Sequence, residues 1–147
     1  GMSESIWYSV DPGSVHTGVC TWDGVEVVES RELRPQEFTE WVSAMIIAAL
    51  TGGARPQRIV AEEFRLEPAR ATALAGSTLG VVRQLGALEL FCWLSSTPLV
   101  LQPNKVLNPA KGLARARGWA YHTRDGSEHA RDAERHGLYF LIREGLI

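Results

Sequence analysis

The sequence contains few cysteines and no long apolar run. Its two cysteines, Cys20 and Cys92, stand among apolar residues and lack the spacing of metal ligands, which favours two buried free thiols over a disulfide. No basic segment followed by an apolar stretch opens the chain, which argues against a signal peptide. The apolar runs also fall short of the roughly 18 residues that a membrane-spanning helix needs. We therefore expect a soluble, cytoplasmic protein.

A strong net charge is absent as well, because 15 Lys and Arg stand against 17 Asp and Glu. The charges are unevenly distributed: residues 65–124 hold 8 basic and 2 acidic side chains, whereas residues 1–64 hold 4 basic and 10 acidic ones. This bias predicts a positive surface beside a cluster of carboxylates. With 147 residues and no internal repeat, the chain suits one domain over residues 1–147. Gly1 before Met2 is interpreted as the remnant of an expression tag.

Hydrophobic periodicity predicts an α/β fold. Runs of β-branched and aromatic residues predict strands at residues 6–10, 17–22, 25–31, 58–64 and 99–101. Apolar residues at helical spacing predict helices at residues 35–50, 72–93, 109–117 and 127–143, with Ser127 as the N-cap of the last. The Asp23-Gly24 dipeptide is typical of a hairpin turn, so the first three strands are expected to be antiparallel. This order indicates a mixed five-stranded sheet flanked by helices.

One carboxylate stands at the end of the first strand, in the stretch VDPGSVHTG. Asp11 directly precedes Pro12-Gly13, and an Asp before such a turn often bonds its own backbone. The alternative is a metal ligand that points beyond the edge of the sheet, where Gly13 and Gly18 would keep bulk away. The stretch alone does not separate these two interpretations.

Two further segments carry acids. Glu62 and Glu63 end the fourth strand and point to opposite faces, while His129, Asp132 and His136 share one face of the last helix. Each segment has a simpler explanation, a strand reaching solvent or a solvated helix face. Together with the first strand, however, they supply oxygen ligands from three distant segments to one edge of the sheet. Hard divalent cations prefer such ligands, and two such ions can hydrolyse a phosphodiester.

Four stretches carry a resemblance to a known family: VDPGSVHTG, IVAEEF, QPNKVLNPAKG and HARDAERH, in this order along nearly the whole chain. In these stretches the sequence resembles the RuvC-like Holliday junction resolvases of the ribonuclease H-like superfamily. The resemblance implies a ribonuclease H-like fold and a Mg²⁺- or Mn²⁺-dependent endodeoxyribonuclease, with two ions, that cleaves four-way DNA junctions. It also implies a homodimer, which would place two active sites on a symmetric junction.

Carried over residue by residue, the resemblance implies that Asp11, Glu62 and Asp132 are catalytic metal ligands. His129 stands where many family members carry a further Asp, so its role is either that of a ligand or that of a proton-transfer group. Glu62 is favoured over Glu63 because the family's acid directly follows the apolar strand.

DNA contacts are expected from the basic middle of the chain. Lys105 matches a family lysine that approaches DNA phosphate. Other basic residues expected along the DNA path are Arg65, Arg70, Arg83, Lys111, Arg115 and Arg117. The long helix is apolar on more than one face, and Phe91 and Trp93 are its candidate dimer contacts.

Three alternatives stay open. A nuclease of this superfamily that acts on flaps or other branched DNA would use the same residues. A catalytically decayed junction-binding protein is favoured only by the departure at His129. An actin-like nucleotide-binding domain needs two related halves, and 147 residues hold only one.

Overall fold

The computed structural model describes residues 5–64, 75–123 and 126–147. The strands are β1 (Ile6–Asp11), β2 (Thr17–Asp23), β3 (Glu26–Leu33), β4 (Ile59–Glu62) and β5 (Leu99–Gln102). The helices are α1 (Pro35–Leu50), α2 (Ala75–Ser95), α3 (Leu107–Ala116) and α4 (Glu128–Arg143), with a single 3₁₀ turn over Asn104–Val106 before α3. The predicted order of elements is confirmed over the described residues.

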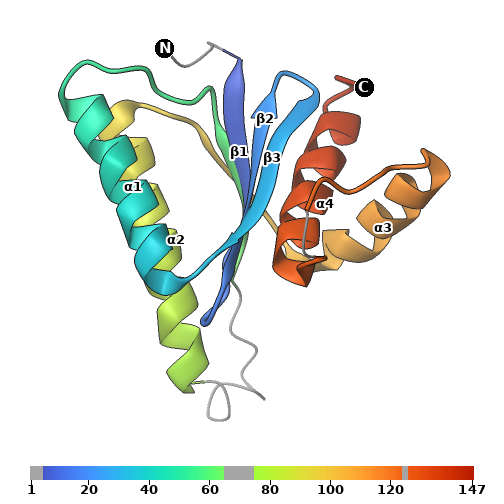
Figure 1. Cartoon of the computed structure of the whole chain (residues 1–147), viewed down its shortest axis with the longest axis horizontal. Coiled ribbons are helices and arrows are strands. Elements are labelled where there is room, and N and C mark those ends of the chain that lie inside the picture. The colour runs from blue at the N-terminus through green and yellow to red at the C-terminus, as the bar shows by residue number, and fades with distance from the viewer. Residues whose placement is uncertain (1–4, 65–74, 124–125) are drawn as a thin grey trace.

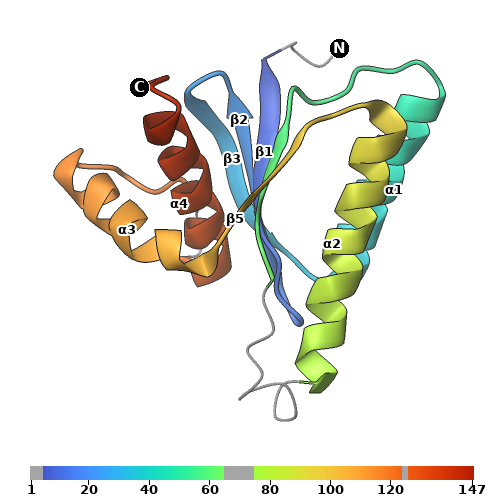
Figure 2. The ribbon, with the colours of Figure 1, turned by 180° about the vertical axis from the view of Figure 1, so that it is seen from behind.

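The strands form one mixed sheet in the order β3-β2-β1-β4-β5. The first three strands are antiparallel, whereas β1, β4 and β5 run parallel to one another. Helices α1 and α2 cover one face of this sheet and α3 and α4 cover the other (Figure 1, Figure 2). The predicted α/β class with a five-stranded mixed sheet is therefore confirmed.

Some predicted boundaries are wrong by a few residues. Strand β4 ends at Glu62, so residues 63 and 64 lie outside it, and α3 begins at Leu107 because the 3₁₀ turn leads directly into it. Ser127 is the N-cap of α4 as predicted, since its hydroxyl accepts a hydrogen bond from the Ala130 amide at 3.2 Å. Residues 72–74, the predicted start of the long helix, lie outside the described residues.

The two faces of the sheet have separate cores. Tyr8, Val10 and Phe38 belong to the core beneath α1 and α2, and Trp7 and Trp22 belong to the core beneath α4. Both cysteines are buried free thiols, as predicted. Within the described part of the chain, no helix is long and apolar enough to cross a membrane.

Helix α4 lies close against the sheet because glycines remove side chains at the contact. A Cβ on Gly137 would lie 2.4 Å from the Trp22 ring, and one on Gly18 would lie 1.8 Å from the His129 carbonyl oxygen. The Ser9 hydroxyl also donates to the Ala133 carbonyl at 2.6 Å. These contacts fix α4 across β1 and β2, and therefore fix the position of every side chain that α4 presents to the ends of the strands.

Candidate active site

Asp11 and Glu62 meet at one edge of the sheet. They end the neighbouring parallel strands β1 and β4, in which Val10 is paired with Ala61, so the two carboxyl groups emerge side by side. They lie close enough for each to shift the pKa of the other, and Asp11 is only 5% exposed. The sequence-based placement of both acids at one sheet edge therefore agrees with the geometry.

The first turns of α4 add His129 to this pair. Its Nδ1 lies 2.9 Å from Asp11 Oδ2, and α4 approaches this closely because Gly18 leaves room for its backbone. A Cβ on Gly13 would lie 2.9 Å from His129 Cε1, so this glycine also keeps space beside the imidazole. The predicted function of the two glycines, to keep bulk away from the end of β1, agrees with these contacts.

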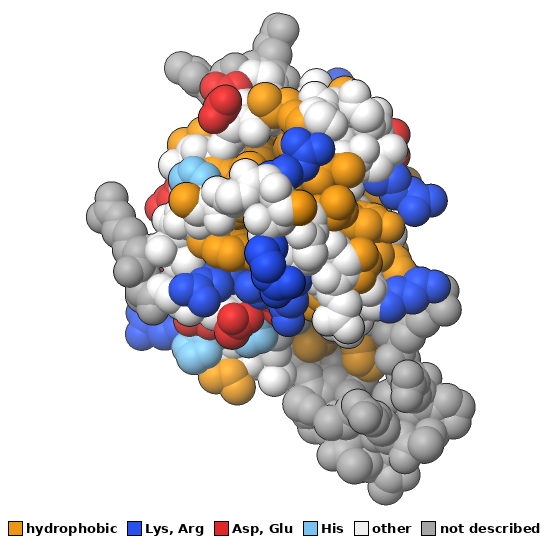
Figure 3. All heavy atoms as spheres, turned by 90° about the vertical axis from the view of Figure 1, so that its right-hand side faces the viewer, with side chains coloured by type: hydrophobic (Ala, Val, Ile, Leu, Met, Phe, Trp, Pro, Cys, Tyr) orange, Lys and Arg blue, Asp and Glu red, His pale blue; other side chains and the backbone are white. Residues whose placement is uncertain are grey.

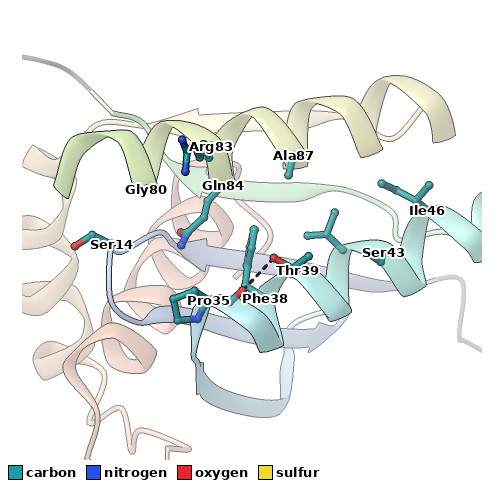
Figure 4. A pocket seen from close by; sticks show the side chains of 11 residues that line it. Ser14, Pro35, Phe38, Thr39, Ser43, Ile46, Gly80, Arg83, Gln84 and Ala87 are labelled. Carbon is teal, nitrogen blue, oxygen red and sulfur yellow. Dashed lines mark hydrogen bonds between the residues drawn. The ribbon is translucent and has the colours of Figure 1, made fainter. Parts of the chain in front are cut away.

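The loop after Asp11 is held by side chains other than that of Asp11. Gln84 of α2 donates to the Gly13 carbonyl at 2.8 Å and accepts from the Thr17 hydroxyl at 2.7 Å. Figure 4 shows Gln84 reaching from α2 toward the loop that carries Ser14, beside a cavity of about 500 Å³ between α1 and α2. Because Gln84 and Thr17 hold the turn, the Asp11 carboxylate is directed to His129 and Glu62 instead.

Asp132 lies beside this group but faces a different partner. Its Oδ1 accepts a hydrogen bond from Arg135 Nη1 at 2.6 Å. Its charge still acts on Asp11 and His129, so it lies near both of them. Over the described ranges, no three His, Cys, Asp or Glu side chains are already arranged to hold a metal ion. The structure places Asp11 against both Glu62 and His129 and leaves Asp132 paired with Arg135.

Burial and the neighbouring charges change the ionisation of the pair. Burial, together with Glu62 and Asp132, raises the pKa of Asp11 from 3.8 to about 8, although the bond to His129 acts in the opposite direction. Burial alone would raise the pKa of Glu62, but hydrogen bonds with His136, Asp11 and Asn104 lower it to about 2. The hydrogen bond with Asp11 raises the pKa of His129.

This donor set fits a divalent cation. Two buried carboxyl groups face each other, and in the absence of a cation one of them keeps a proton to avoid two adjacent charges. A hard cation would replace that proton and bind oxygen atoms of both groups. Asp11 and Glu62 could hold such an ion, with His129 bonded to Asp11 and Asp132 paired with Arg135.

Sequence reasoning missed the residues that hold Glu62. His136 is fully buried, with Nε2 3.1 Å from Glu62 Oε2 and Nδ1 2.9 Å from Gln102 Oε1. Asn104 donates to the other Glu62 oxygen at 2.7 Å. Both oxygens of this carboxylate are thereby anchored. The spacing of His136 from His129 placed it on the same helix face, but no local signal pointed to Gln102 or Asn104.

The predicted DNA-binding residues fall on more than one surface. Lys105 is exposed in the 3₁₀ turn, directly after Asn104, and Arg117 is exposed at the end of α3. Lys111 and Arg115 of α3 line a cavity of about 280 Å³. Figure 3 shows Lys and Arg side chains near the centre of the face that carries α3 and α4, above a group of Asp, Glu and His.

The remaining basic residues lie elsewhere. Arg83 lines the cavity between α1 and α2, on the opposite side of the sheet from α3. Arg65 and Arg70 lie outside the described residues. Of the two candidate dimer contacts, Trp93 is 78% exposed, but the expectation for Phe91 is wrong, because Phe91 is 1% exposed and packs in the core.

No family model and no curated protein matches this sequence. Among the solved structures that match its fold are two of Thermus thermophilus RuvC. Thermus thermophilus RuvC in complex with a Holliday junction substrate aligns with a TM-score of 0.61 and 19% identity, covering 95% of this chain and 96% of that one. A second structure of Thermus thermophilus RuvC aligns with a TM-score of 0.56 and 20% identity, with the same coverage. The chain therefore has the RuvC fold, a ribonuclease H-like α/β fold on a mixed five-stranded sheet.

Proposed function

We propose that this chain is a metal-dependent endodeoxyribonuclease that resolves four-way DNA junctions. The observation that carries the proposal is the contact among Asp11, Glu62 and His129, which three distant segments bring to one sheet edge. The same fold in Thermus thermophilus RuvC, which was solved with a Holliday junction substrate, supports the choice of substrate. The proposal treats residues 1–147 as one nuclease domain that acts in the cytoplasm.

In this proposal four side chains hold Mg²⁺ or Mn²⁺: Asp11, Glu62, His129 and Asp132. When bound, two such ions supply an activated water and neutralise the charge that develops on the phosphate. The protein's own part is to hold the ligands rigidly. His136 and Asn104 keep both Glu62 oxygens in place, and Gln84 holds the loop after Asp11 by donating to the Gly13 carbonyl.

The DNA path is proposed to follow the basic side chains on the α3 side of the sheet. Lys105, Lys111, Arg115 and Arg117 would contact phosphates, which gives affinity without sequence readout. A homodimer formed through α2 is proposed to place two sites on one junction, and Trp93 is its candidate contact because this large apolar side chain is 78% exposed.

One observation favours a second candidate, a junction-binding protein that has lost cleavage. Asp132 is already paired with Arg135 at 2.6 Å, so one proposed ligand is engaged elsewhere. A nuclease for flaps or other branched DNA is the other alternative. It needs the same four ligands and differs only in the DNA that it accepts.

The test is cleavage of labelled four-way junction, flap and linear duplex, each in Mn²⁺, Mg²⁺ or EDTA. We expect paired, symmetric cuts in the junction that require a divalent ion. Asp11→Asn is expected to abolish cleavage and to bind the junction nearly as well as the wild type, because binding rests on the basic surface. Preferred cutting of the flap would support the branched-DNA alternative, and tight junction binding without any cleavage would support the decayed one.

A further inference from the structure

A cavity of about 280 Å³ lies between α3 and α4, next to the candidate active site. Its lining consists of Lys111, Ala114, Arg115, Trp119, Tyr121 and Arg135. Three of these six side chains are cationic and none is acidic. A small polar cavity of this composition fits a tetrahedral anion such as a backbone phosphate, with the aromatic side chains forming its walls.

Two of the cations form no ion pair with the described residues. These are Lys111 and Arg115 of α3, whereas Arg135 is paired with Glu128 and Asp132. Two such side chains in consecutive turns of one helix raise the local positive potential. An anion entering the cavity would therefore meet two positive charges that form no ion pair with the described residues.

The third cation, Arg135, connects the cavity to the active site. Its Nη1 donates to Asp132 at 2.6 Å and to Glu128 at 3.0 Å, and its Nε donates to the Tyr121 hydroxyl at 2.9 Å. Its guanidinium carbon also lies 4.9 Å from the centre of the Tyr121 ring. One guanidinium thus lines the cavity and at the same time engages a proposed metal ligand.

We propose that this cavity binds a phosphate of the DNA backbone, and that the bound phosphate draws Arg135 away from Asp132 so that Asp132 can turn to the metal site. The inference rests on the proposed function and deepens it. A phosphate held by Lys111 and Arg115 offers the Arg135 guanidinium several strong acceptors. These compete with the one oxygen each that Asp132 and Glu128 supply. The metal site is then complete only when DNA is in place, because the arginine that engages Asp132 is also part of the phosphate site.

The test measures metal affinity rather than cleavage. Mn²⁺ is titrated into protein free of DNA, with calorimetric detection, in the presence of sodium sulfate or of sodium chloride at equal ionic strength. Sulfate is a tetrahedral dianion and serves as the probe for the cavity. For the wild type we expect tighter Mn²⁺ binding in sulfate than in chloride, since an occupied cavity releases Asp132.

Variants separate the two steps of the coupling. Arg135→Gln is expected to bind Mn²⁺ about tenfold more tightly than the wild type in chloride, and to lose the response to sulfate. Replacing both Lys111 and Arg115 by Gln should leave the Mn²⁺ affinity in chloride unchanged. It should also abolish the increase of that affinity in sulfate. The matched control is Arg143→Gln on the same helix, whose guanidinium bonds Tyr139 rather than the site and which should behave like the wild type.

A second variant keeps the test valid if Arg135→Gln does not fold. Tyr121→Phe removes the acceptor of Arg135 Nε without changing any charge, and it should raise the Mn²⁺ affinity in chloride by a smaller factor. Equal Mn²⁺ affinity in chloride for the wild type, Arg135→Gln and Tyr121→Phe would overturn the inference. Because no step of this experiment requires cleavage, a protein that shows the coupling and cuts no DNA would contradict the proposed nuclease activity and leave the coupling intact.

Discussion

Asp11→Asn is expected to stabilise the metal-free protein, and more so as the pH rises. The pKa of Asp11 is raised from 3.8 to about 8 in the folded state, first by burial and then by the charges of Glu62 and Asp132. Between these pH values the folded protein keeps a proton that the unfolded chain has lost. A raised pKa contributes stability that is complete below pH 3.8 and is lost as the pH rises through about 8. The free energy of unfolding of the wild type therefore falls over this window.

The size of the effect follows from the shift. Stability falls by up to about 1.4 kcal/mol per pH unit inside the window, which gives about 3 kcal/mol between about pH 5.5 and about pH 8. The raised pKa of His129, which Asp11 causes, acts in the same direction. The lowered pKa of Glu62 changes the stability only below about pH 4.5, its ordinary pKa, and so has no effect between the two pH values compared. Asparagine resembles the protonated carboxyl group in shape and does not titrate. The variant therefore does not lose this stability as the pH rises.

The assay is urea unfolding of both proteins in EDTA at the two pH values. We expect the advantage of Asp11→Asn over the wild type to grow by about 3 kcal/mol from the lower pH to the higher one. Added Mn²⁺ should then stabilise the wild type at the higher pH and have a much smaller effect on the variant. If both proteins lose the same stability between the two pH values, Asp11 is not a carboxyl group that burial keeps protonated, and the inference of a carboxyl pair suited to a cation fails.

Three further predictions concern the fold, the anchoring of the site and the oligomeric state. His136→Phe removes the imidazole that holds the Glu62 carboxylate, and it should weaken Mn²⁺ binding about 10- to 100-fold in calorimetry. An unchanged Mn²⁺ affinity would contradict this role of His136. Gly18→Ala places a Cβ 1.8 Å from the His129 carbonyl oxygen and should cost about 1–3 kcal/mol or more in urea unfolding, whereas Gly86→Ala, with nothing within 4 Å, should not destabilise. Trp93→Ser should convert a dimer to a monomer in light scattering; a wild type that is already monomeric at micromolar concentration would refute this assignment.

The order of the elements was predictable from sequence because each element carries its own local signal. The apolar residues of α1 recur at helical spacing after Pro35, and the predicted range, residues 35–50, is the observed one. The start of α3 was predicted too late because Asn104–Val106 forms a 3₁₀ turn whose residues have no distinct pattern. Local periodicity identifies an element and its type, while its ends depend on the neighbouring turns.

The candidate site was predictable only in part. Asp11 and Glu62 could be placed together from sequence because parallel neighbouring strands end at the same edge of a sheet. The anchoring of Glu62 could not, since Gln102 and His136 meet it through the packing of β5 and α4, segments far apart in the chain. The pairing of Asp132 was local but overlooked: Arg135 follows at i+3, a spacing that favours an ion pair on a helix.

Helix α4 supplies a basic partner for each proposed acidic ligand. The pairs are Asp11–His129, Glu62–His136 and Asp132–Arg135. Three acids close together at a largely buried sheet edge would repel one another, and partners on one helix reduce this repulsion while the site lacks a cation. The three partners differ in what a cation requires of them. An imidazole can itself bind the metal or keep its ligand oriented, whereas a guanidinium cannot lose its proton and must move away. In the proposed metal site, Asp132–Arg135 is therefore the pair that would have to open for all four ligands to bind, and it is also the pair whose arginine lines the cavity with Lys111 and Arg115.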